Sequence, residues 1–278
     1  MPTINVVDKQ RAFRKMHESG FFVIPNPWDV GSARYLQCIG FKALATTSSG
    51  LAWANGLPDG QVPRDVMIRH LRAMVAATDV PVSADFQGGF ADELDDLEES
   101  ISLAIETGIA GLSIEDATGD TSKPIRDLCD AVARVRAVRK IIDRSGSDVL
   151  LVVRADNFFA GVTDLDDTIE RLKAYSAAGA DCLFAPGIST RQQIAAVVAA
   201  VAPKPVNVLV PGESNLTLQE IAELGVRRVS VGGALARAAW GGFMHAAQVL
   251  AEQERFDGFQ GAPAGAQLNT MFCTDPHQ

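Results

Sequence analysis

The chain has 278 residues, of which 47% are hydrophobic and 21% are charged, and its formal net charge is −9. A chain of this length and composition can bury a large core, which excludes general disorder. The acidic balance argues against nucleic-acid binding, because sequence-independent contacts to phosphates need a positive surface. A small anionic substrate stays possible, since one arginine and a metal ion can invert the field inside a cleft.

Nothing in the sequence predicts a membrane protein or a secreted protein. It has no uninterrupted apolar run of the roughly 18 residues that a membrane span needs. The first twenty residues lack the hydrophobic stretch and cleavage site of a secretory signal. The four cysteines are far apart and form no CxxC pair, so we expect neither structural zinc nor a disulfide framework. These features predict a cytoplasmic protein.

Short apolar runs alternate with longer amphipathic segments along the chain. The segments 125–144, 164–178 and 189–201 repeat apolar residues at three- and four-residue steps, as helices do. The short runs are almost wholly apolar, which is typical of parallel strands covered on both faces. The predicted strands are Phe22–Pro25, Ala43–Thr47, Val80–Asp85, Gly111–Glu115, Val149–Arg154, Cys182–Ala185, Val206–Leu209 and Arg228–Val231.

Several predicted helices end in a glycine just before the next strand, where a helix C-terminus needs a left-handed residue. The recurring βα unit predicts an α/β fold, a closed (β/α)₈ TIM barrel forming a single domain over residues 1–257. An open doubly wound sheet is the alternative. The Gly-, Ala- and Pro-rich segment 258–278 is either an arm that packs on a neighbour or a disordered tail. The glycines are Gly40, Gly108, Gly179 and Gly225.

Charged residues end three of the predicted strands, at the edge where a barrel places its active site. Asp85 and Glu115 end neighbouring strands, and Arg154 ends the next one. Two converging carboxylates repel each other unless one is protonated or a cation lies between them. Oxygen ligands without histidine or cysteine suit Mg²⁺ or Mn²⁺. Alternatively, Arg154 simply pairs with the two carboxylates, or they cap the following helices.

Other polar residues have simpler interpretations. Arg154 can hold a carboxylate through two parallel hydrogen bonds. The segment TTSSGLAWANGLPDG offers a turn whose backbone amides could bind an anion, and by turn chemistry alone Asp59 is a turn residue. The histidines lie on predicted helices or in the tail, so no Ser-His-Asp triad is expected. A basic stripe is interpreted as a solvated helix face: Arg134, Arg136, Arg139, Lys140 and Arg144.

Over residues 10–255 the chain resembles the isocitrate lyase/phosphoenolpyruvate mutase superfamily. The pieces that carry the resemblance are NPWDVGSARYLQCIGFKALATTSSGLAWANGLPDG, VPVSADFQGGFAD, AGLSIED and VVRADNFFAG, in this order. The resemblance implies a Mg²⁺-dependent barrel whose C-terminal helix is exchanged between subunits of a homodimer or homotetramer. It also implies reactions that make or break C–C or P–C bonds beside the carboxylate of a small 2-oxo or 2-hydroxy acid, through a pyruvate-like enolate.

The resemblance also implies roles for individual residues. The Ser48–Ser49–Gly50 turn and Asn207 would bind the substrate, and Trp28 would help shape the space for its variable substituent. Asp59, Glu115 and Arg154 are expected to be catalytic. The residues expected at the metal are Asp85, Gln87 and Glu115.

Two departures from the superfamily pattern restrict the expected reaction. Gln87 stands where a second acid is usual, so the metal site has one negative charge fewer and we expect weaker metal binding. The loop DATGDTSKPIRDL after Glu115 lacks the Lys-Lys-Cys-Gly-His stretch of isocitrate and methylisocitrate lyases and the longer loop of the mutases. Isocitrate lyase activity is therefore not expected.

The leading hypothesis is a Mg²⁺-dependent lyase or decarboxylase that cleaves a C–C bond of a small 2-oxo or 2-hydroxy acid. Decarboxylation needs no base at the leaving group, so it tolerates the missing cysteine. One alternative is a hydrolase or phosphomutase acting on the P–C bond of a phosphonopyruvate-type substrate. The other is a barrel that binds a metabolite without turning it over.

Overall fold

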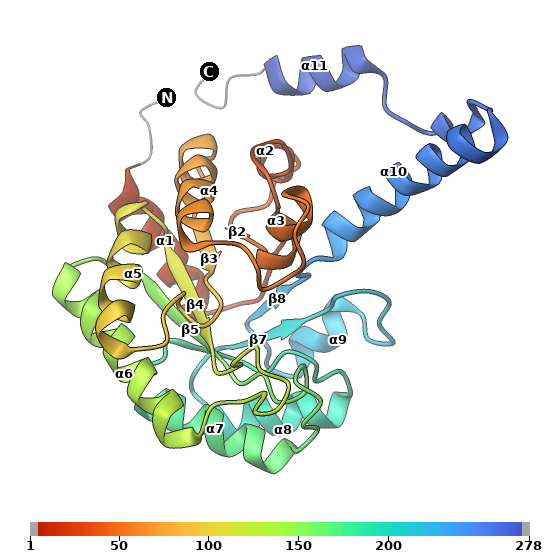
Figure 1. Cartoon of the computed structure of the whole chain (residues 1–278). Coiled ribbons are helices and arrows are strands. Elements are labelled where there is room, and N and C mark those ends of the chain that lie inside the picture. The colour runs from red at the N-terminus through yellow and green to blue at the C-terminus, as the bar shows by residue number, and fades with distance from the viewer. Residues whose placement is uncertain (1–4, 274–278) are drawn as a thin grey trace.

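A computed structural model describes residues 5–273 and shows a parallel barrel surrounded by helices (Figure 1). The strand order is β1-β8-β7-β6-β5-β4-β3-β2, and β1 pairs in parallel with β8. The backbone N–H of Ala45 donates to the carbonyl of Pro25, which joins β2 to the end of β1. This confirms the TIM barrel and excludes the open sheet. The strands are β1 Phe22–Ile24, β2 Leu44–Ala45, β3 Val82–Asp85, β4 Gly111–Glu115, β5 Leu150–Arg154, β6 Cys182–Phe184, β7 Val206–Leu209 and β8 Arg228–Ser230.

The strands begin and end within two residues of the predicted positions. Successive side chains alternate between the barrel interior and the helices outside. In β4, Leu112 and Ile114 join the core cluster packed against the helices, whereas Glu115 lies at the inner mouth of the barrel. Arg154 follows the same rule at the end of β5. Alternation therefore turns the strand-ending charges towards one another.

Helices follow the strands and cover the outside of the barrel (Figure 1). Capping boxes start three of them, with Asp29 before α2, Thr190 before α8 and Thr217 before α9. All four glycines predicted at helix ends have positive φ angles. The helices are α1 Val6–Glu18, α2 Val30–Cys38, α3 Ser48–Ala54, α4 Arg64–Ala77, α5 Leu94–Glu106, α6 Leu128–Ser145, α7 Leu165–Ala177, α8 Arg191–Val201, α9 Leu218–Glu223, α10 Ala234–Gln253, η1 Asp257–Phe259 and α11 Gly265–Cys273.

Helix α1 closes the N-terminal end of the barrel. Phe13 is fully buried and belongs to the interior cluster with Ile24 and Leu150. It packs so closely that a Cβ on Gly111 would lie 2.6 Å from its ring. His17, one turn later, makes edge-on contacts with Phe13 and Phe22. The barrel therefore has an aromatic floor opposite the mouth that carries the charged residues.

The C-terminal elements leave the barrel. Helix α10 extends outward, and α11 lies against α2, where Arg34 donates to the carbonyl of Phe272 and stacks on its ring (Figure 1). The described part of the predicted tail thus contains the end of η1 and all of α11, while positions 274–278 lie outside the described residues. Within residues 5–273, every helix is too short or too polar to cross a membrane.

The basic stripe on α6 is only partly a solvated face. Arg136, Lys140 and Arg144 are exposed, but Arg134 is buried and donates to three backbone carbonyls of the loop after β3. Arg139 is half-buried and pairs with Asp181. The prediction was wrong for Arg134 because the loop after β3 folds over α6, which periodicity within the helix does not show.

Candidate active site

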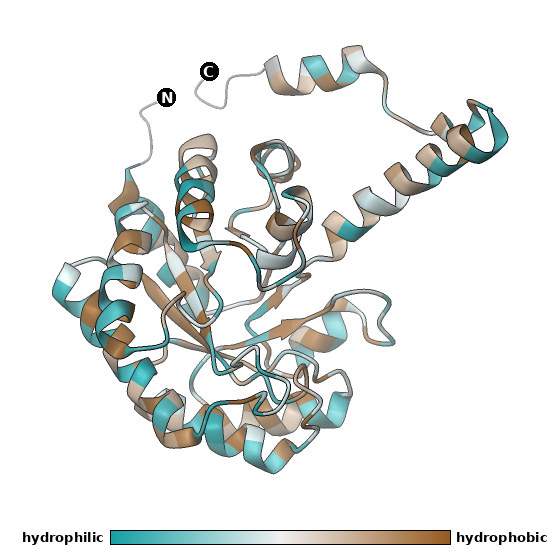
Figure 2. Cartoon of the chain, in the orientation of Figure 1, coloured by the Kyte–Doolittle hydropathy of each residue, from teal (hydrophilic) through white to brown (hydrophobic). Residues whose placement is uncertain are grey.

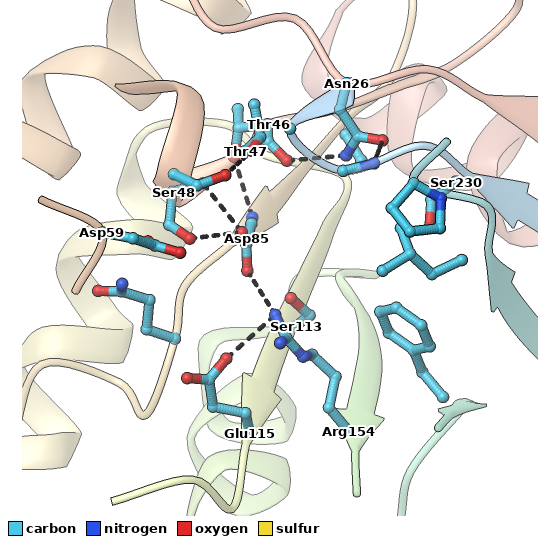
Figure 3. Close-up of a pocket in the computed structure, with 18 of the residues that line it drawn as sticks. Asn26, Thr46, Thr47, Ser48, Asp59, Asp85, Ser113, Glu115, Arg154 and Ser230 are labelled. Carbon is cyan, nitrogen blue, oxygen red and sulfur yellow. Dashed lines mark hydrogen bonds and ion pairs between the residues drawn. The ribbon is translucent and has the colours of Figure 1, made fainter. Parts of the chain in front are cut away.

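A cavity of about 590 Å³ opens at the C-terminal ends of the strands. Asp85, Glu115 and Arg154 meet in it from β3, β4 and β5 (Figure 3). Both acids are largely buried, with 19% and 16% of their side chains exposed. The three residues predicted from the strand ends therefore do form one cluster.

Arg154 is the centre of this cluster. Its Nη1 lies 3.1 Å from Oδ1 of Asp85 and 3.0 Å from Oε2 of Glu115. Its other edge is held by Asp156, with Nε donating to Oδ1 at 3.0 Å and Nη2 to Oδ2 at 2.7 Å. Burial alone would lower the pKa of Arg154, but the three carboxylates raise it well above its ordinary value. The guanidinium is therefore a permanent cation that bridges the two strand-ending acids.

Asp156 is a site residue that the sequence analysis missed. It is 3% exposed and lies two residues beyond the end of β5. Its backbone N–H donates to Asp116, whose other oxygen accepts from Tyr175 at 2.6 Å and from Arg171 at 3.3 Å. This buried network fixes Asp156 from behind. The signal in the sequence was the spacing of Arg154 and Asp156, because a charged residue two positions beyond the end of β5 lies at the same mouth of the barrel as Arg154.

Asp85 is also fixed from the side of β2. The backbone N–H and the hydroxyl of Ser48 both donate to Oδ2 of Asp85, at 2.9 and 2.8 Å. The hydroxyl of Thr46 accepts from the backbone N–H of Asp85. Ser49 lines the cavity, and its hydroxyl lies 3.0 Å from that of Thr47. The Ser48–Ser49 turn thus orients a carboxylate of the protein and leaves Ser49 facing the cavity.

Asp59 points from its loop towards Ser48 and Asp85 (Figure 3). Partial desolvation and the charge of Asp85 raise the pKa of Asp59 above its ordinary value. Burial raises the pKa of Glu115 to about 8, against the opposing pull of Arg154. Burial is the larger cause of both shifts and the neighbouring carboxylates add to each, so a cation bound among them would favour the ionised forms.

The remaining predicted residues are divided between the cavity and its surroundings. Gln87 lines the cavity, with a positive φ of 50°. Trp28 lies outside it, in a hollow with Trp240 of α10. Gly50 is buried below the turn. Asn207 is fully buried in β7, and its amide is bonded to Ser230 and Arg228, so its polar atoms do not face the cavity.

Asn26 is a further residue whose role the sequence did not reveal. Its amide nitrogen donates to the carbonyl of Thr46, and its oxygen accepts from the backbone N–H groups of Val231 and Gly232. It is 5% exposed and lines the cavity. One side chain therefore ties the ends of β1, β2 and β8 together and shapes this side of the mouth.

The oxygen donors of the cavity suit a hard cation such as Mg²⁺. No group of three or more acidic, histidine or cysteine side chains converges to hold a metal within residues 5–273. Mg²⁺ does not need such a cage, since it usually binds one or two carboxylates and keeps waters that a substrate can displace. Asp85 and Glu115 are the two carboxylates that would hold it.

The chain matches known proteins over nearly its whole length. The family model of phosphoenolpyruvate phosphomutase matches residues 13–251. A solved structure from Burkholderia cenocepacia, provisionally described as a lyase/mutase, is 46% identical, covers 98% of each chain and has a TM-score of 0.93. An uncharacterized protein of Mycobacterium tuberculosis is 33% identical over 248 residues, which are 88% of this chain and 90% of that protein.

Two further relatives have named activities. An oxaloacetate decarboxylase of Rhodopseudomonas palustris is 32% identical over 166 residues, which are 58% of this chain and 55% of the relative. The structure of an oxaloacetate acetylhydrolase with its product oxalate is 25% identical, covers 96% of this chain and 94% of the other, and has a TM-score of 0.86. Together with the carboxylate cluster at the barrel mouth, these matches show that the chain is an enzyme of the phosphoenolpyruvate phosphomutase family, within the isocitrate lyase/phosphoenolpyruvate mutase superfamily.

Proposed function

We propose that the protein is a Mg²⁺-dependent lyase that cleaves a C–C bond of a small 2-oxo or 2-hydroxy acid, with oxaloacetate as the first substrate to test. The observation that carries the proposal is the cluster in which Arg154 bridges Asp85 and Glu115 at the barrel mouth. The relatives that act on oxaloacetate support this choice of substrate.

When bound, Mg²⁺ would supply positive charge beside the substrate oxygens that become negative as the bond breaks. Asp85, held by Ser48, would keep its carboxylate facing the cation. Arg154 would contribute fixed positive charge, although its two-pronged edge is occupied by Asp156. Ser49 faces the space in which a substrate carboxylate would lie.

Asp59 is the group best placed to move a proton. Its raised pKa increases the fraction of the carboxyl that is protonated near neutral pH. After decarboxylation, the protonated oxygen of Asp59 would deliver its proton to the carbon that lost the carboxylate. In a retro-aldol cleavage, the ionised form would instead remove the proton from the substrate hydroxyl.

The direct test is turnover of oxaloacetate and a panel of 2-oxo acids by purified protein with and without Mg²⁺. We expect Mg²⁺-dependent turnover that Asp85→Asn abolishes and that Asp95→Asn, at an exposed position on α5, leaves unchanged. Absence of turnover across the panel, in a protein shown to bind Mg²⁺, would refute the lyase assignment.

The phosphomutase match favours a second candidate, cleavage of a P–C bond. Release of inorganic phosphate from phosphonopyruvate would identify the hydrolase, and formation of phosphoenolpyruvate or its reverse would identify the mutase. A barrel that only binds metabolites would instead be stabilised by these acids without converting any of them.

We propose further that α10 packs on a second subunit, in a dimer or tetramer. Hydrophobic residues continue along this helix away from the barrel (Figure 2). Phe243 and Met244 are 63% and 52% exposed, and neighbouring exposed apolar side chains of this kind mark a protein–protein contact. Light scattering should give a homo-oligomer, and Phe243→Glu should shift it towards monomer; a monomeric wild type would contradict this.

A further inference from the structure

Arg228 is a buried cation that the proposed chemistry does not use. It begins β8, at the floor end of the barrel, and is 3% exposed. Arg228 is one of the residues that line the same cavity whose mouth holds Asp85 and Glu115. It therefore faces the cavity from the side opposite the carboxylate cluster.

The groups around Arg228 are neutral. Its Nε donates to the amide oxygen of Asn207 at 2.8 Å, and its Nη1 lies 3.5 Å from Nε2 of His17. His17 donates its Nδ1–H to the carbonyl of Phe13, which leaves Nε2 as an acceptor. Burial and the charge of Arg228 lower the pKa of His17 to about 3, so this imidazole is neutral. Among residues 5–273, no carboxylate forms an ion pair with Arg228.

An arginine in this position is unusual, because a buried charge is normally paired with an opposite charge. Burial lowers the pKa of Arg228, as desolvation of an uncompensated cation does. Arginine nevertheless stays protonated, and it has five N–H donors in a planar fork. Its two polar contacts do not use all of these donors, and an anion in the cavity would supply the missing charge.

We propose that Arg228, oriented by Asn207 and His17, forms an anion subsite on the cavity floor that binds the second carboxylate of a small dicarboxylic acid. The first carboxylate would lie at the mouth, beside Ser49. The assignment of the ligand as a carboxylic acid rests on the proposed function, whereas the anion subsite rests on the isolation of Arg228. The subsite makes the enzyme selective for dicarboxylates over monocarboxylates of the same length.

The test uses unreactive probes on the full-length protein freed of divalent metal. Succinate and butyrate have the same number of carbons and differ in one carboxylate. Calorimetric titration should show that the wild type binds succinate at least about tenfold more tightly than butyrate. Arg228→Met should lose about tenfold in succinate affinity and leave butyrate binding unchanged. The matched control is Arg237→Met, which removes an exposed arginine lining the same cavity and should change neither.

A crystal structure with succinate tests the subsite without any variant. A carboxylate within hydrogen-bond distance of the Arg228 guanidinium supports the proposal, and succinate bound only at the mouth overturns it. Equal loss in Arg228→Met and Arg237→Met also overturns it. Arg228-dependent succinate binding by a protein that turns over no 2-oxo acid would refute the lyase function and leave the subsite standing. Turnover of a 2-oxo acid, together with succinate binding that does not depend on Arg228, would refute the subsite and leave the lyase function standing.

Discussion

Asp156 holds Arg154 side-on, through two hydrogen bonds of 3.0 and 2.7 Å that join both carboxylate oxygens to one edge of the guanidinium. Such a two-pronged pair fixes the plane of an arginine as well as its charge. The plane determines where Nη1 lies, and Nη1 bridges the two acids that would hold the cation. Asp156 therefore positions the cluster without belonging to the strand ends.

Asp156→Asn should reduce turnover about 10–100-fold, the usual effect of removing a group that orients a metal site. The amide keeps one acceptor for Arg154 but loses the charge and the second acceptor. Circular dichroism should show a folded protein, and Asp95→Asn serves as the control for loss of a carboxylate. Turnover equal to that of the wild type would show that Arg154 needs no such support.

Gly50→Ala should disturb the turn that orients Asp85. A Cβ at this position would lie 2.7 Å from Cγ2 of Thr47 and 2.8 Å from Cβ of Trp28. Overpacking of this kind costs about 1–3 kcal/mol, and the strain falls on the helix that begins with Ser48.

Denaturant unfolding and turnover should both record this effect. Gly212→Ala is the matched control, because its nearest contact would be at 4.0 Å and its φ is ordinary. If Gly50→Ala unfolds like Gly212→Ala, the close packing beneath the turn is not essential.

The sequence predicted the barrel and the central cluster for the same reason. Side chains alternate between the two faces along each strand, and all parallel strands end at the same mouth of the barrel. Both rules apply directly to the sequence, and together they place Asp85, Glu115 and Arg154 in one cavity. The rules do not extend to pairings made across the barrel. His17 and Arg228 are 211 residues apart in sequence, and only the docking of α1 under the barrel brings them together.

The buried histidines should make the protein acid-sensitive. Burial lowers the pKa of His17 to about 3 and that of His70 to about 4. As the pH falls below about 6.5, the unfolded chain takes up protons at both positions while the folded chain does not, so stability falls. At pH 5 each histidine should cost about 2 kcal/mol relative to neutral pH.

His17→Asn removes one of the two histidines and should therefore halve this loss of stability. Asparagine can keep a hydrogen bond to the carbonyl of Phe13. Unfolding in denaturant at pH 7.5 and pH 5 measures the difference. His245→Asn, at an exposed position on α10, should leave it unchanged. An equal pH dependence in wild type and His17→Asn would mean that His17 is protonated in the fold.

Gln87 lines the cavity with a left-handed backbone, which aspartate tolerates better than glutamine does. Gln87→Asp would therefore add a carboxylate near Asp85 at little cost in backbone strain. At an effective dielectric constant of about 20, the attraction between an added carboxylate and the cation contributes about 1 kcal/mol or more. Gln87→Asp should therefore raise Mg²⁺ affinity by about tenfold. Calorimetric titration with Mg²⁺ measures it, and Gln87→Asn is the uncharged control. Equal Mg²⁺ affinity in Gln87→Asp and Gln87→Asn would show that position 87 does not face the cation.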